Sequence, residues 1–380
     1  MPGLRSLKFR FPWRAGNRFR LLVDGRQFVP RIIGAIDAAR DEVLIEMYLF
    51  ESGAVATRVL DALCAAAARG VRVHVLLDDF GALGLEAEDR RRLYAAGAKL
   101  AYYNPLHTTK LLRNFFRDHR KLVVADGAVA FTGGAGITDE FDPPDRPYDA
   151  WRETMIEIRG PVVRDWQALF SDTWSRCDGA PLAPPEAEAA PAGASRGRVA
   201  AVQGPLNQEI QRSLLRRVHN ARTRVWIATA YFLPSWKVRR ALLAAVRRGA
   251  DVRLLLPGPI TDHPAVRHAG RRFYHRLLRH GVRIFEFQPR FLHQKVALCD
   301  DWVSIGSANL DRWNLRWNLE ANQEVDDSAF ARAVHAMLVA DFRDATECLY
   351  EAWKQRPWYR RAPEWLWMLV DRALERLGRR

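Results

Sequence analysis

The stretch DHRKLVVADGAVAFTGGAGITDEF, residues 118–141, places a histidine, a lysine and an aspartate ahead of a cluster of glycines. The stretch LHQKVALCDDWVSIGSANLD, residues 292–311, has the same His-x-Lys-x4-Asp spacing. Two such matches rarely arise by chance in one chain, so we interpret them as two copies of one functional motif. The motif residues are His119, Lys121, Asp126, His293, Lys295 and Asp300.

The segments around the motif also recur in the same order, which indicates that the chain was built by duplication. EVLIEMYLF (42–50) matches RVWIATAYF (224–232), and RGVRVHVLLD (69–78) matches RGADVRLLLP (248–257). These short apolar runs alternate with longer helical patterns, which is typical of buried strands covered by helices on both faces. We therefore predict an α/β fold made of two duplicated domains.

The predicted domains span residues 17–177 and 199–350. Residues 178–198 lie between them and are rich in Pro and Ala, so they are predicted to form a linker. Residues 1–16 are a basic N-terminal segment, and residues 351–380 are predicted to end the chain as an amphipathic helix. The two terminal segments either belong to the body of the protein or together hold it on an anionic bilayer.

The composition limits the partners and the compartment. The chain of 380 residues has a formal net charge of +15, which attracts nucleic acid, anionic membranes or phosphorylated substrates. Its four cysteines form no C-x-x-C pair, which argues against a zinc site and favours a reducing compartment. The sequence has no apolar run of transmembrane length and no signal-peptide core, so we expect neither a membrane span nor secretion by that route.

The spacing of the motif predicts which side chains act together. Residues 121–126 and 295–300 have the pattern of strands, and side chains two apart on a strand point to the same face. Each motif histidine therefore projects beside the lysine that follows it. The same parity sends Asp126 and Asp300 to the other face or into the next turn, where we expect them to hold that turn.

Two His–Lys pairs that meet across a pseudo-twofold axis form a positively charged pocket suited to phosphate. One imidazole can attack phosphorus to form a phospho-histidine, while the other protonates the leaving oxygen and later deprotonates the incoming alcohol or water. The two lysines neutralise charge in the transition state, so we expect no metal and no other cofactor.

Four further residues are candidates for this site. Each histidine needs an acceptor for its second ring nitrogen, and Glu153 and Glu320 occupy corresponding places after the two glycine clusters. A surface salt bridge is the alternative reading of each carboxylate. Ser307 and Asn309, in the turn GSAN, can donate hydrogen bonds to phosphate oxygens.

The doubled H-x-K-x4-D motif followed by GSAN resembles the signature of the phospholipase D superfamily. Within it, HRKLVVADGAVAFTGG, GSANLD, NLEAN and YFLP are most similar to bacterial cardiolipin synthases of the short type without N-terminal transmembrane helices. The resemblance runs from about residue 17 to about residue 350. It implies two phospholipase D-like α/β/α sandwich domains that form a pseudo-dimer with one shared active site.

The resemblance also implies an activity, a metal-independent transfer of a phosphatidyl group from phosphatidylglycerol to the hydroxyl of a second phospholipid. It implies that His119 is the nucleophile and His293 the acid and base, although the richer donor set beside His293 keeps the reverse assignment open. One departure is in the first half, where Gly134 and Gly136 stand at the positions of the pattern's Ser and Asn.

We therefore expect a peripheral protein on the cytoplasmic face of the bacterial inner membrane. Its expected partner is anionic phospholipid, phosphatidylglycerol with or without phosphatidylethanolamine, and no nucleic acid. The alternatives are a phospholipase D-type hydrolase, a nuclease or phosphodiesterase of the same superfamily, and a membrane-binding scaffold without activity. The chain lacks a basic run dense enough to follow a nucleic-acid backbone, which favours lipid.

Overall fold

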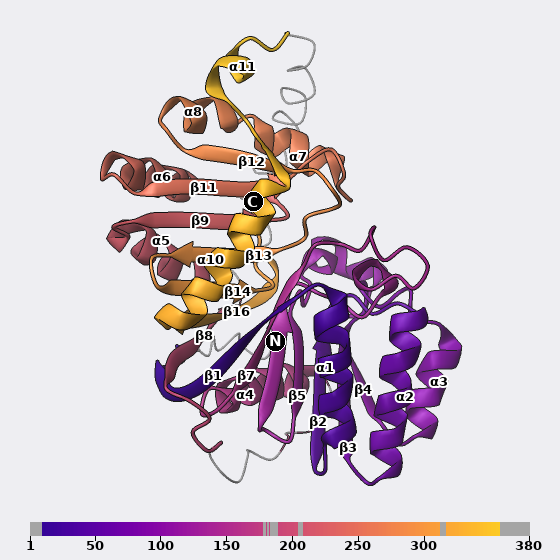
Figure 1. Cartoon of the computed structure of the whole chain (residues 1–380). Helices are drawn as coiled ribbons and strands as arrows, with labels where there is room; N and C mark the ends of the chain where they lie inside the picture. Colours follow the sequence, from indigo (N-terminus) through magenta and orange to yellow (C-terminus); the bar gives the residue numbers. More distant parts are fainter. Residues whose placement is uncertain are drawn as a thin grey trace.

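A computed structural model describes the chain at residues 10–177, 180, 182, 189–203, 208–311 and 317–357. In this part of the chain, fifteen strands form one sheet in the order β17-β12-β11-β9-β13-β14-β16-β8-β1-β7-β6-β5-β2-β3-β4, and β10 pairs separately with β15. The sheet therefore runs through both halves of the molecule, with β8 and β1 joining them (Figure 1).

The first half combines a parallel βαβ region with an antiparallel region. Strands β2, β3 and β4 are parallel, and β5, β6, β7 and β1 follow them as antiparallel neighbours. Its main elements are β1 (Arg14–Val23), α1 (Gly25–Ala38), β2 (Glu42–Met47), α2 (Ala54–Ala68), β3 (Arg72–Asp78), α3 (Ala87–Ala95), β4 (Lys99–Tyr103), η1 (Thr108–Phe115), β5 (Lys121–Ala125), β6 (Val129–Gly133), η2 (Asp139–Phe141), β7 (Thr154–Arg159) and α4 (Val163–Cys177).

The second half repeats this arrangement. Strands β9, β11 and β12 are parallel, and β13, β14, β16 and β8 follow as antiparallel neighbours. Its main elements are β8 (Ser195–Gln203), α5 (Glu209–Asn220), β9 (Arg224–Thr229), β10 (Phe232–Leu233), α6 (Trp236–Arg247), β11 (Asp251–Pro257), α7 (Pro264–Arg271), α8 (Tyr274–Arg279), β12 (Arg283–Phe287), β13 (Lys295–Cys299), β14 (Trp302–Gly306), β15 (Leu310–Asp311), β16 (Leu319–Asp326), α10 (Ser328–Arg343), β17 (Ala345–Glu347) and α11 (Tyr350–Lys354). The predicted duplication and α/β class are confirmed.

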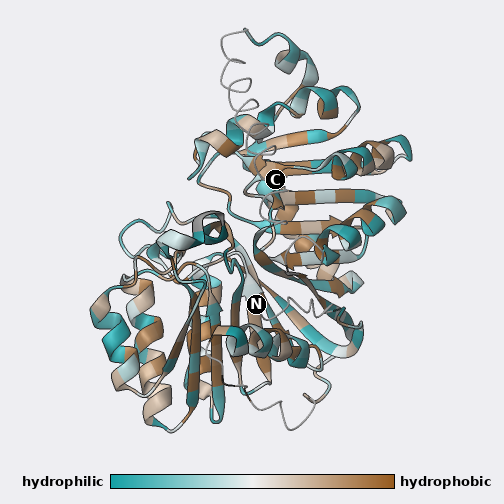
Figure 2. Ribbon diagram, turned by 180° about the vertical axis from the view of Figure 1, so that it is seen from behind, coloured by the Kyte–Doolittle hydropathy of each residue, from teal (hydrophilic) through white to brown (hydrophobic). Residues whose placement is uncertain are grey.

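Helices cover both faces of the sheet because the strands are apolar on both sides. In the first half α1 and α2 pack over one hydrophobic cluster, and α4 packs on the opposite face. Helix α1 buries Phe28, Val29, Ile32 and Ile36, which lie on one face at helical spacing. Figure 2 shows the resulting pattern, with hydrophobic residues concentrated along the strands.

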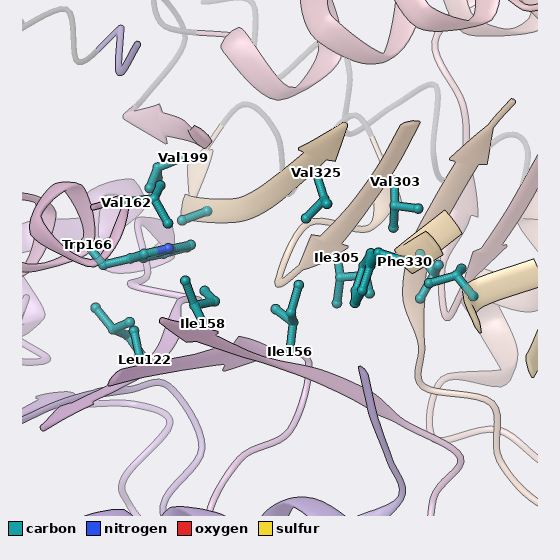
Figure 3. Packing of buried hydrophobic residues seen from close by; sticks show 14 of the residues in the cluster. Leu122, Ile156, Ile158, Val162, Trp166, Val199, Val303, Ile305, Val325 and Phe330 are labelled. Atoms are coloured by element: carbon teal, nitrogen blue, oxygen red, sulfur yellow. The ribbon is translucent and has the colours of Figure 1, made fainter. Parts of the chain in front are cut away.

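One hydrophobic cluster joins the two halves. Ile156 of β7 in the first half and Ile305 of β14 in the second belong to it, and both are fully buried (Figure 3). Trp166 of α4 lies in the same cluster and donates a hydrogen bond from its indole nitrogen to Gln323 of β16, at 2.8 Å. Burying each large apolar side chain contributes about 1.5–3 kcal/mol, so this shared core holds the halves in one arrangement.

Two strands begin inside segments that were predicted to lie outside the two domains. Strand β8 begins at Ser195, inside the segment 178–198 that was predicted to be a linker, because its backbone pairs with β16 and β1. Strand β1 begins at Arg14, inside the predicted N-terminal segment 1–16. Residues 1–9 and 358–380 lie outside the described residues, and so does most of the predicted C-terminal helix. Among the described residues, no helix has the length and apolar composition needed to cross a bilayer.

Candidate active site

Both motifs begin at the same kind of place in the sheet. Lys121 starts β5, which is antiparallel to β2, so His119 and Lys121 lie at the edge where the parallel strands β2, β3 and β4 end. Lys295 starts β13 at the corresponding edge of β9, β11 and β12. We call these two places the site edges. Functional side chains collect at the carboxyl ends of parallel strands, and here the two edges share one site.

The histidine of the first motif is hydrogen-bonded to the second half. The backbone N–H of His119 donates to the carbonyl of Leu319 at 3.0 Å, and the N–H of Leu319 donates to the carbonyl of Arg117 at 2.9 Å. The next residue, Glu320, places a carboxylate oxygen 3.0 Å from Nδ1 of His119. Glu320 therefore orients the imidazole of the opposite half.

The histidine of the second motif is fastened to the first half in the same way. The N–H of His293 donates to the carbonyl of Arg152 at 2.9 Å, and the N–H of Arg152 donates to the carbonyl of Phe291 at 2.8 Å. Glu153 places its Oε2 atom 2.6 Å from Nδ1 of His293. Each half thus supplies one histidine and the carboxylate for the other half's histidine, so neither half holds a complete site.

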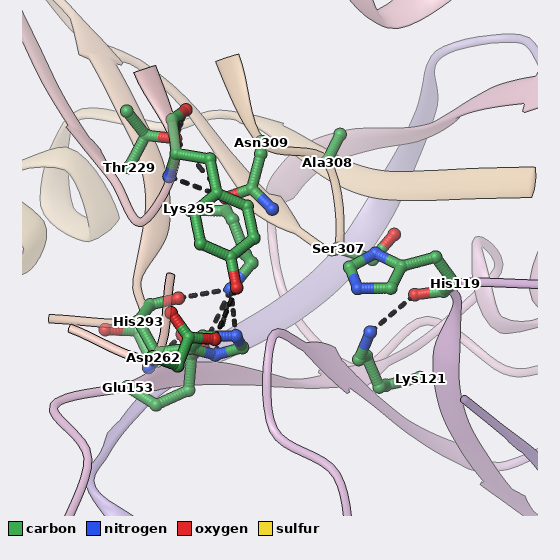
Figure 4. A network of polar contacts seen from close by, with 12 residues as sticks. His119, Lys121, Glu153, Thr229, Asp262, His293, Lys295, Ser307, Ala308 and Asn309 are labelled. Atoms are coloured by element: carbon green, nitrogen blue, oxygen red, sulfur yellow. Dashed lines mark hydrogen bonds and ion pairs between the residues drawn. The ribbon is translucent and has the colours of Figure 1, made fainter. Parts of the chain in front are cut away.

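The two lysines lie in this buried site, Lys121 beside His119 and Lys295 beside His293 (Figure 4). Lys121 donates from Nζ to the carbonyl of His119 at 2.7 Å, and Lys295 Nζ lies 3.4 Å from Glu153 Oε2. Burial lowers the pKa of Lys121 to about 7 and also lowers the pKa of Lys295. A group of buried cations without a ligand resists full protonation, and a bound anion reverses this effect.

Burial also shifts the pKa values of the two histidines and the two glutamates, in each case toward the uncharged form. Burial, together with the two lysines, lowers the pKa of His119 and of His293 well below the usual value. Burial raises the pKa of Glu153 to about 7 and of Glu320 to about 8. Each His–Glu pair therefore shares a proton near neutral pH, and the pair titrates as a unit.

Ser307 and Asn309 differ in what they offer a ligand. The hydroxyl of Ser307 donates to Glu320 Oε2 at 2.5 Å, so Ser307 supports the glutamate. Donation by Ser307 to a phosphate oxygen stays a prediction. The Oδ1 atom of Asn309 accepts from the N–H of Tyr231 at 3.3 Å, while its Nδ2 atom is buried without a hydrogen-bond partner among the described residues. That amide is the donor suited to a phosphate oxygen.

Two glycines of the first half, Gly134 and Gly136, lie so close to other atoms that a side chain would not fit. A Cβ atom on Gly134 would lie 2.1 Å from Glu153 Oε2, and a Cβ atom on Gly136 would lie 2.6 Å from the carbonyl oxygen of Leu49. Glu153 occupies the space that a serine side chain would need. The site is asymmetric because only the second half has a hydroxyl beneath its glutamate.

Asp126 and Asp300 hold the turns after the motif strands, as strand parity predicts. Both have left-handed backbones, with φ angles of 51° and 49°. Each carboxylate accepts backbone N–H groups from the segment that starts the neighbouring strand, which removes several unpaired donors. The donors are Arg40, Asp41 and Glu42 for Asp126, and Arg222, Thr223 and Arg224 for Asp300.

Two residues near His293 were not found from the sequence. Tyr231 donates from its hydroxyl to Asp262 Oδ2 at 2.5 Å, and Figure 4 shows Asp262 close to His293 and Lys295. Burial and the lysines lower the pKa of His293, and the carboxylate of Asp262 opposes them. Asp262 follows the carboxyl end of β11 closely, and that position is the signal that could have identified it.

Aromatic side chains enclose the two imidazoles to different degrees. The ring of His293 lies among Phe141, Trp151 and Phe291, with centroid distances of 5.6, 5.1 and 5.6 Å. The ring of His119 meets Tyr48 at 4.7 Å. Such walls exclude water from the reacting groups and strengthen their electrostatic interactions.

A repeated α/β unit with two His–Lys pairs joined at one site defines the phospholipase D-like class. In agreement, residues 32–174 and 214–341 match the family model described as cardiolipin synthase, PLD-like domain. The fold is similar to that of phosphatidylserine synthase from Haemophilus influenzae Rd KW20, with a TM-score of 0.74 and 15% identity over 97% of this chain and 96% of that chain.

Curated relatives narrow the class. Cardiolipin synthase A of Pseudomonas putida (strain W619) is 38% identical over 346 residues, which are 89% of this chain and 71% of that protein. Cardiolipin synthase A of Pseudomonas aeruginosa (strain LESB58) is 37% identical over 358 residues, 91% of this chain and 71% of that protein. The chain belongs to the cardiolipin synthase family, and it is a phosphatidyltransferase of the phospholipase D superfamily.

Proposed function

We propose that the protein transfers a phosphatidyl group from phosphatidylglycerol to the free hydroxyl of a second glycerol-bearing phospholipid, forming cardiolipin and releasing glycerol. The observation that carries this proposal is the shared site, in which His119 and His293 each have a carboxylate from the opposite half on Nδ1. Each imidazole therefore presents its Nε2 atom for chemistry at phosphorus. We place the protein peripherally at the cytoplasmic face of the bacterial inner membrane, where phosphatidylglycerol is available.

The first step forms a phospho-histidine. Nε2 of His119 attacks phosphorus, the new P–N bond forms, and the P–O bond to the glycerol headgroup breaks. His293 donates its proton to the departing glycerol oxygen. In the second step the acceptor hydroxyl loses its proton to His293, its oxygen attacks phosphorus, and the P–N bond breaks to restore His119.

The transition state gathers negative charge on the phosphoryl oxygens. Lys121 and Lys295 supply two cations, and the unpaired Nδ2 atom of Asn309 supplies a neutral donor. Donors held in place before the reaction stabilise this charge without reorganising, which is often the largest contribution to catalysis.

Two carboxylates act on each of the two histidines. Asp262 is a further negative charge that favours the protonated form of His293, which suits a general acid. For His119, the Nδ1 atom is directed to Glu320, and the charge of Glu153 also favours the protonated form. With the shared proton on Nδ1, the lone pair of Nε2 is free to attack.

The function is tested by incubating the protein with phosphatidylglycerol vesicles and separating the lipids, beside a plasmid-nicking assay. We expect cardiolipin and glycerol in equal amounts and no nicking. Release of phosphatidic acid alone would indicate a hydrolase, and nicking alone would indicate a nuclease.

The mechanism needs a separate experiment. The His293→Ala variant, given a phosphatidyl substrate with a leaving group that needs no protonation, should accumulate a phosphorylated peptide that contains His119. A label on His293 in the His119→Ala variant would reverse the assignment.

A further inference from the structure

The first half carries an insertion that the second half lacks. Residues 104–120 lie between β4 and β5, whereas the corresponding connection between β12 and β13 is residues 288–294. The insertion contains the 3-10 helix η1 and leads directly into His119. It therefore lies beside the active site.

The insertion is folded on itself. Asn104, in the left-handed region with a φ of 44°, donates from Nδ2 to the carbonyls of Arg113 and Phe116, each at 2.8 Å. Across the loop, the N–H of His107 donates to Asn114 Oδ1 at 3.3 Å, and Asn114 Nδ2 donates to the carbonyl of His107 at 2.9 Å. These bonds hold the side chains of the loop in defined directions.

Two apolar side chains of the loop point outward, toward solvent. Phe115 is 68% exposed and Leu106 is 42% exposed, whereas the next residue, Phe116, packs against Trp317 of the second half at a centroid distance of 4.9 Å. A folded loop that points a phenylalanine and a leucine at solvent is unfavourable unless another surface covers them.

Exposed hydrophobic side chains elsewhere in the described chain also lie mostly near the site edges. Of the large hydrophobic side chains that are exposed in the described chain, all but two lie on segments that leave or enter the site edges. The members of this group are Phe80, Leu83, Leu106, Phe115, Tyr148, Trp236 and Ile260. The two exceptions are Tyr94, near the end of α3, and Leu349, after β17, which lie toward the opposite edge. The exposed apolar side chains of the described chain are therefore concentrated at the site edges.

The insertion also carries positive charge. Lys110 donates from Nζ to Asn104 Oδ1 at 3.1 Å, and Arg113 is exposed. Neither side chain forms an ion pair with a described residue, so both charges are uncompensated. Exposed hydrophobic residues beside cations without an ion-pair partner fit the interface of an anionic bilayer, which attracts each cation and accommodates the apolar groups.

We propose that the insertion docks the protein on an anionic phospholipid bilayer, with Phe115 and Leu106 in the interfacial layer and Lys110 and Arg113 at the headgroups. The proposal rests on the proposed function for its choice of a lipid surface. Docking in this orientation turns the site edges toward the bilayer, so that a lipid phosphate reaches the two histidines while its acyl chains remain in the membrane.

The test measures binding to vesicles of phosphatidylglycerol and phosphatidylcholine by sedimentation. Phe115→Ser and Leu106→Ser should each weaken binding about tenfold, because each loses an apolar side chain from the interface. Tyr94→Ser and Leu349→Ser remove exposed side chains of similar size at the opposite edge and should change binding less than about twofold. Arg113→Gln should weaken binding about fivefold on phosphatidylglycerol and leave binding to pure phosphatidylcholine unchanged.

Two further measurements separate docking from catalysis. Phe115→Ser should lose activity on vesicles and keep it on detergent-dispersed lipid, and His119→Ala should bind vesicles like the unaltered protein. Equal binding by Phe115→Ser, Leu106→Ser and the two control variants would overturn the proposal. If the unaltered protein forms no cardiolipin but still binds through Phe115, the docking surface stands and the proposed function fails.

Discussion

The two half-sites contain the same His–Lys pair in different surroundings. Around His119, one tyrosine ring packs on the imidazole and Ser307 supports the orienting carboxylate. Around His293, three aromatic rings pack on the imidazole, Asp262 adds a second carboxylate, and Gly134 leaves the orienting carboxylate without a hydroxyl. The duplication thus placed two equivalent His–Lys pairs at one site, and their neighbours have diverged, as the different tasks proposed for the two histidines require.

The largest expected effect comes from removing either histidine. His119→Ala and His293→Ala should each lower kcat by at least about a thousandfold, because the two groups act in one reaction, and the double variant should be no slower than the weaker single one. Steady-state rates with a melting curve for each variant measure this. Appreciable turnover by one single variant would mean that the half-sites work separately.

The second prediction makes the first half resemble the second. Gly134→Ser adds a side chain whose Cβ would lie 2.1 Å from Glu153 Oε2, so the carboxylate must move away from His293. A displacement of that size should cost about a hundredfold in kcat. The matched variant, Ser307→Gly, makes the second half resemble the first and removes the hydrogen bond to Glu320 and the one accepted from the N–H of Ala321. It should cost about tenfold.

The comparison of the two losses of kcat shows whether the position of Glu153 matters more than the hydrogen bonds of Ser307. If Gly134→Ser is as active as the unaltered protein, the site tolerates movement of Glu153, and the asymmetry of the glycine cluster has no catalytic meaning. Crystals or hydrogen-exchange data of the variant would then show whether the main chain had shifted instead.

The third prediction uses the pKa of the lysine in the first half-site. Burial lowers the pKa of Lys121 to about 7, so without a ligand the ammonium is present below that pH and is lost above it. An inorganic anion such as tungstate binds the protonated form. Its affinity should therefore be highest below pH 7 and should fall by up to about tenfold per pH unit above it, because binding then requires proton uptake.

Calorimetry or a thermal-shift titration at pH 6 and pH 8.5 measures this dependence. Lys121→Gln should bind the anion weakly at both pH values and lose the dependence. An affinity that rises with pH would show that the proton balance of the site is set by the glutamates rather than by the lysine.

The sequence predicted the parts of this site that depend on local geometry. The spacing of His119, Lys121 and Asp126 is read within one strand and one turn, where alternation of side chains decides which groups lie together. The α/β class and the duplication followed from repeated strand and helix patterns for the same reason.

The remaining features depend on contacts between distant segments. Glu320 serves the histidine of the other half because β16 meets the residues before β5, and no local pattern records that pairing. Ser307 supports Glu320 because β14 and β16 are neighbours in the sheet. Asp262 accepts a hydrogen bond from Tyr231, and the two residues follow the neighbouring strands β11 and β9, which lie far apart in the sequence. Tertiary packing selects these partners, so the sequence alone left them open.

The fourth prediction concerns the aspartates that hold the turns in the two halves. Asp126→Asn and Asp300→Asn should each lower the free energy of unfolding by about 1–3 kcal/mol, because each carboxylate accepts several backbone N–H groups. Below the melting transition, kcat should change by less than about twofold, since neither carboxylate is hydrogen-bonded to the histidines or lysines of the site. Loss of activity with an unchanged melting temperature would place the aspartate in the chemistry.

The lowered pKa of Asp300 also predicts how the melting temperature depends on pH. Burial alone would raise the pKa of Asp300, but the hydrogen bonds from Thr223 and the neighbouring backbone lower it below the usual value. A carboxyl group with a depressed folded-state pKa stabilises the protein above its unfolded pKa, near 4, and that stabilisation is lost as the pH falls through the folded value. Asp300→Asn should therefore remove part of the fall in melting temperature below pH 4.

The smallest expected effect is that of a metal chelator. In the proposed mechanism, Lys121 and Lys295 together supply the positive charge that the phosphoryl oxygens need, in place of a metal ion. Within the described residues, no three His, Cys, Asp or Glu side chains form a group able to hold a metal ion. Ethylenediaminetetraacetate at millimolar concentration should leave the initial rate of cardiolipin formation unchanged within error, on vesicles and on detergent-dispersed lipid alike. An effect on vesicles alone would act through the lipid surface, whereas inhibition in detergent that one divalent ion reverses would show that the lysines do not suffice.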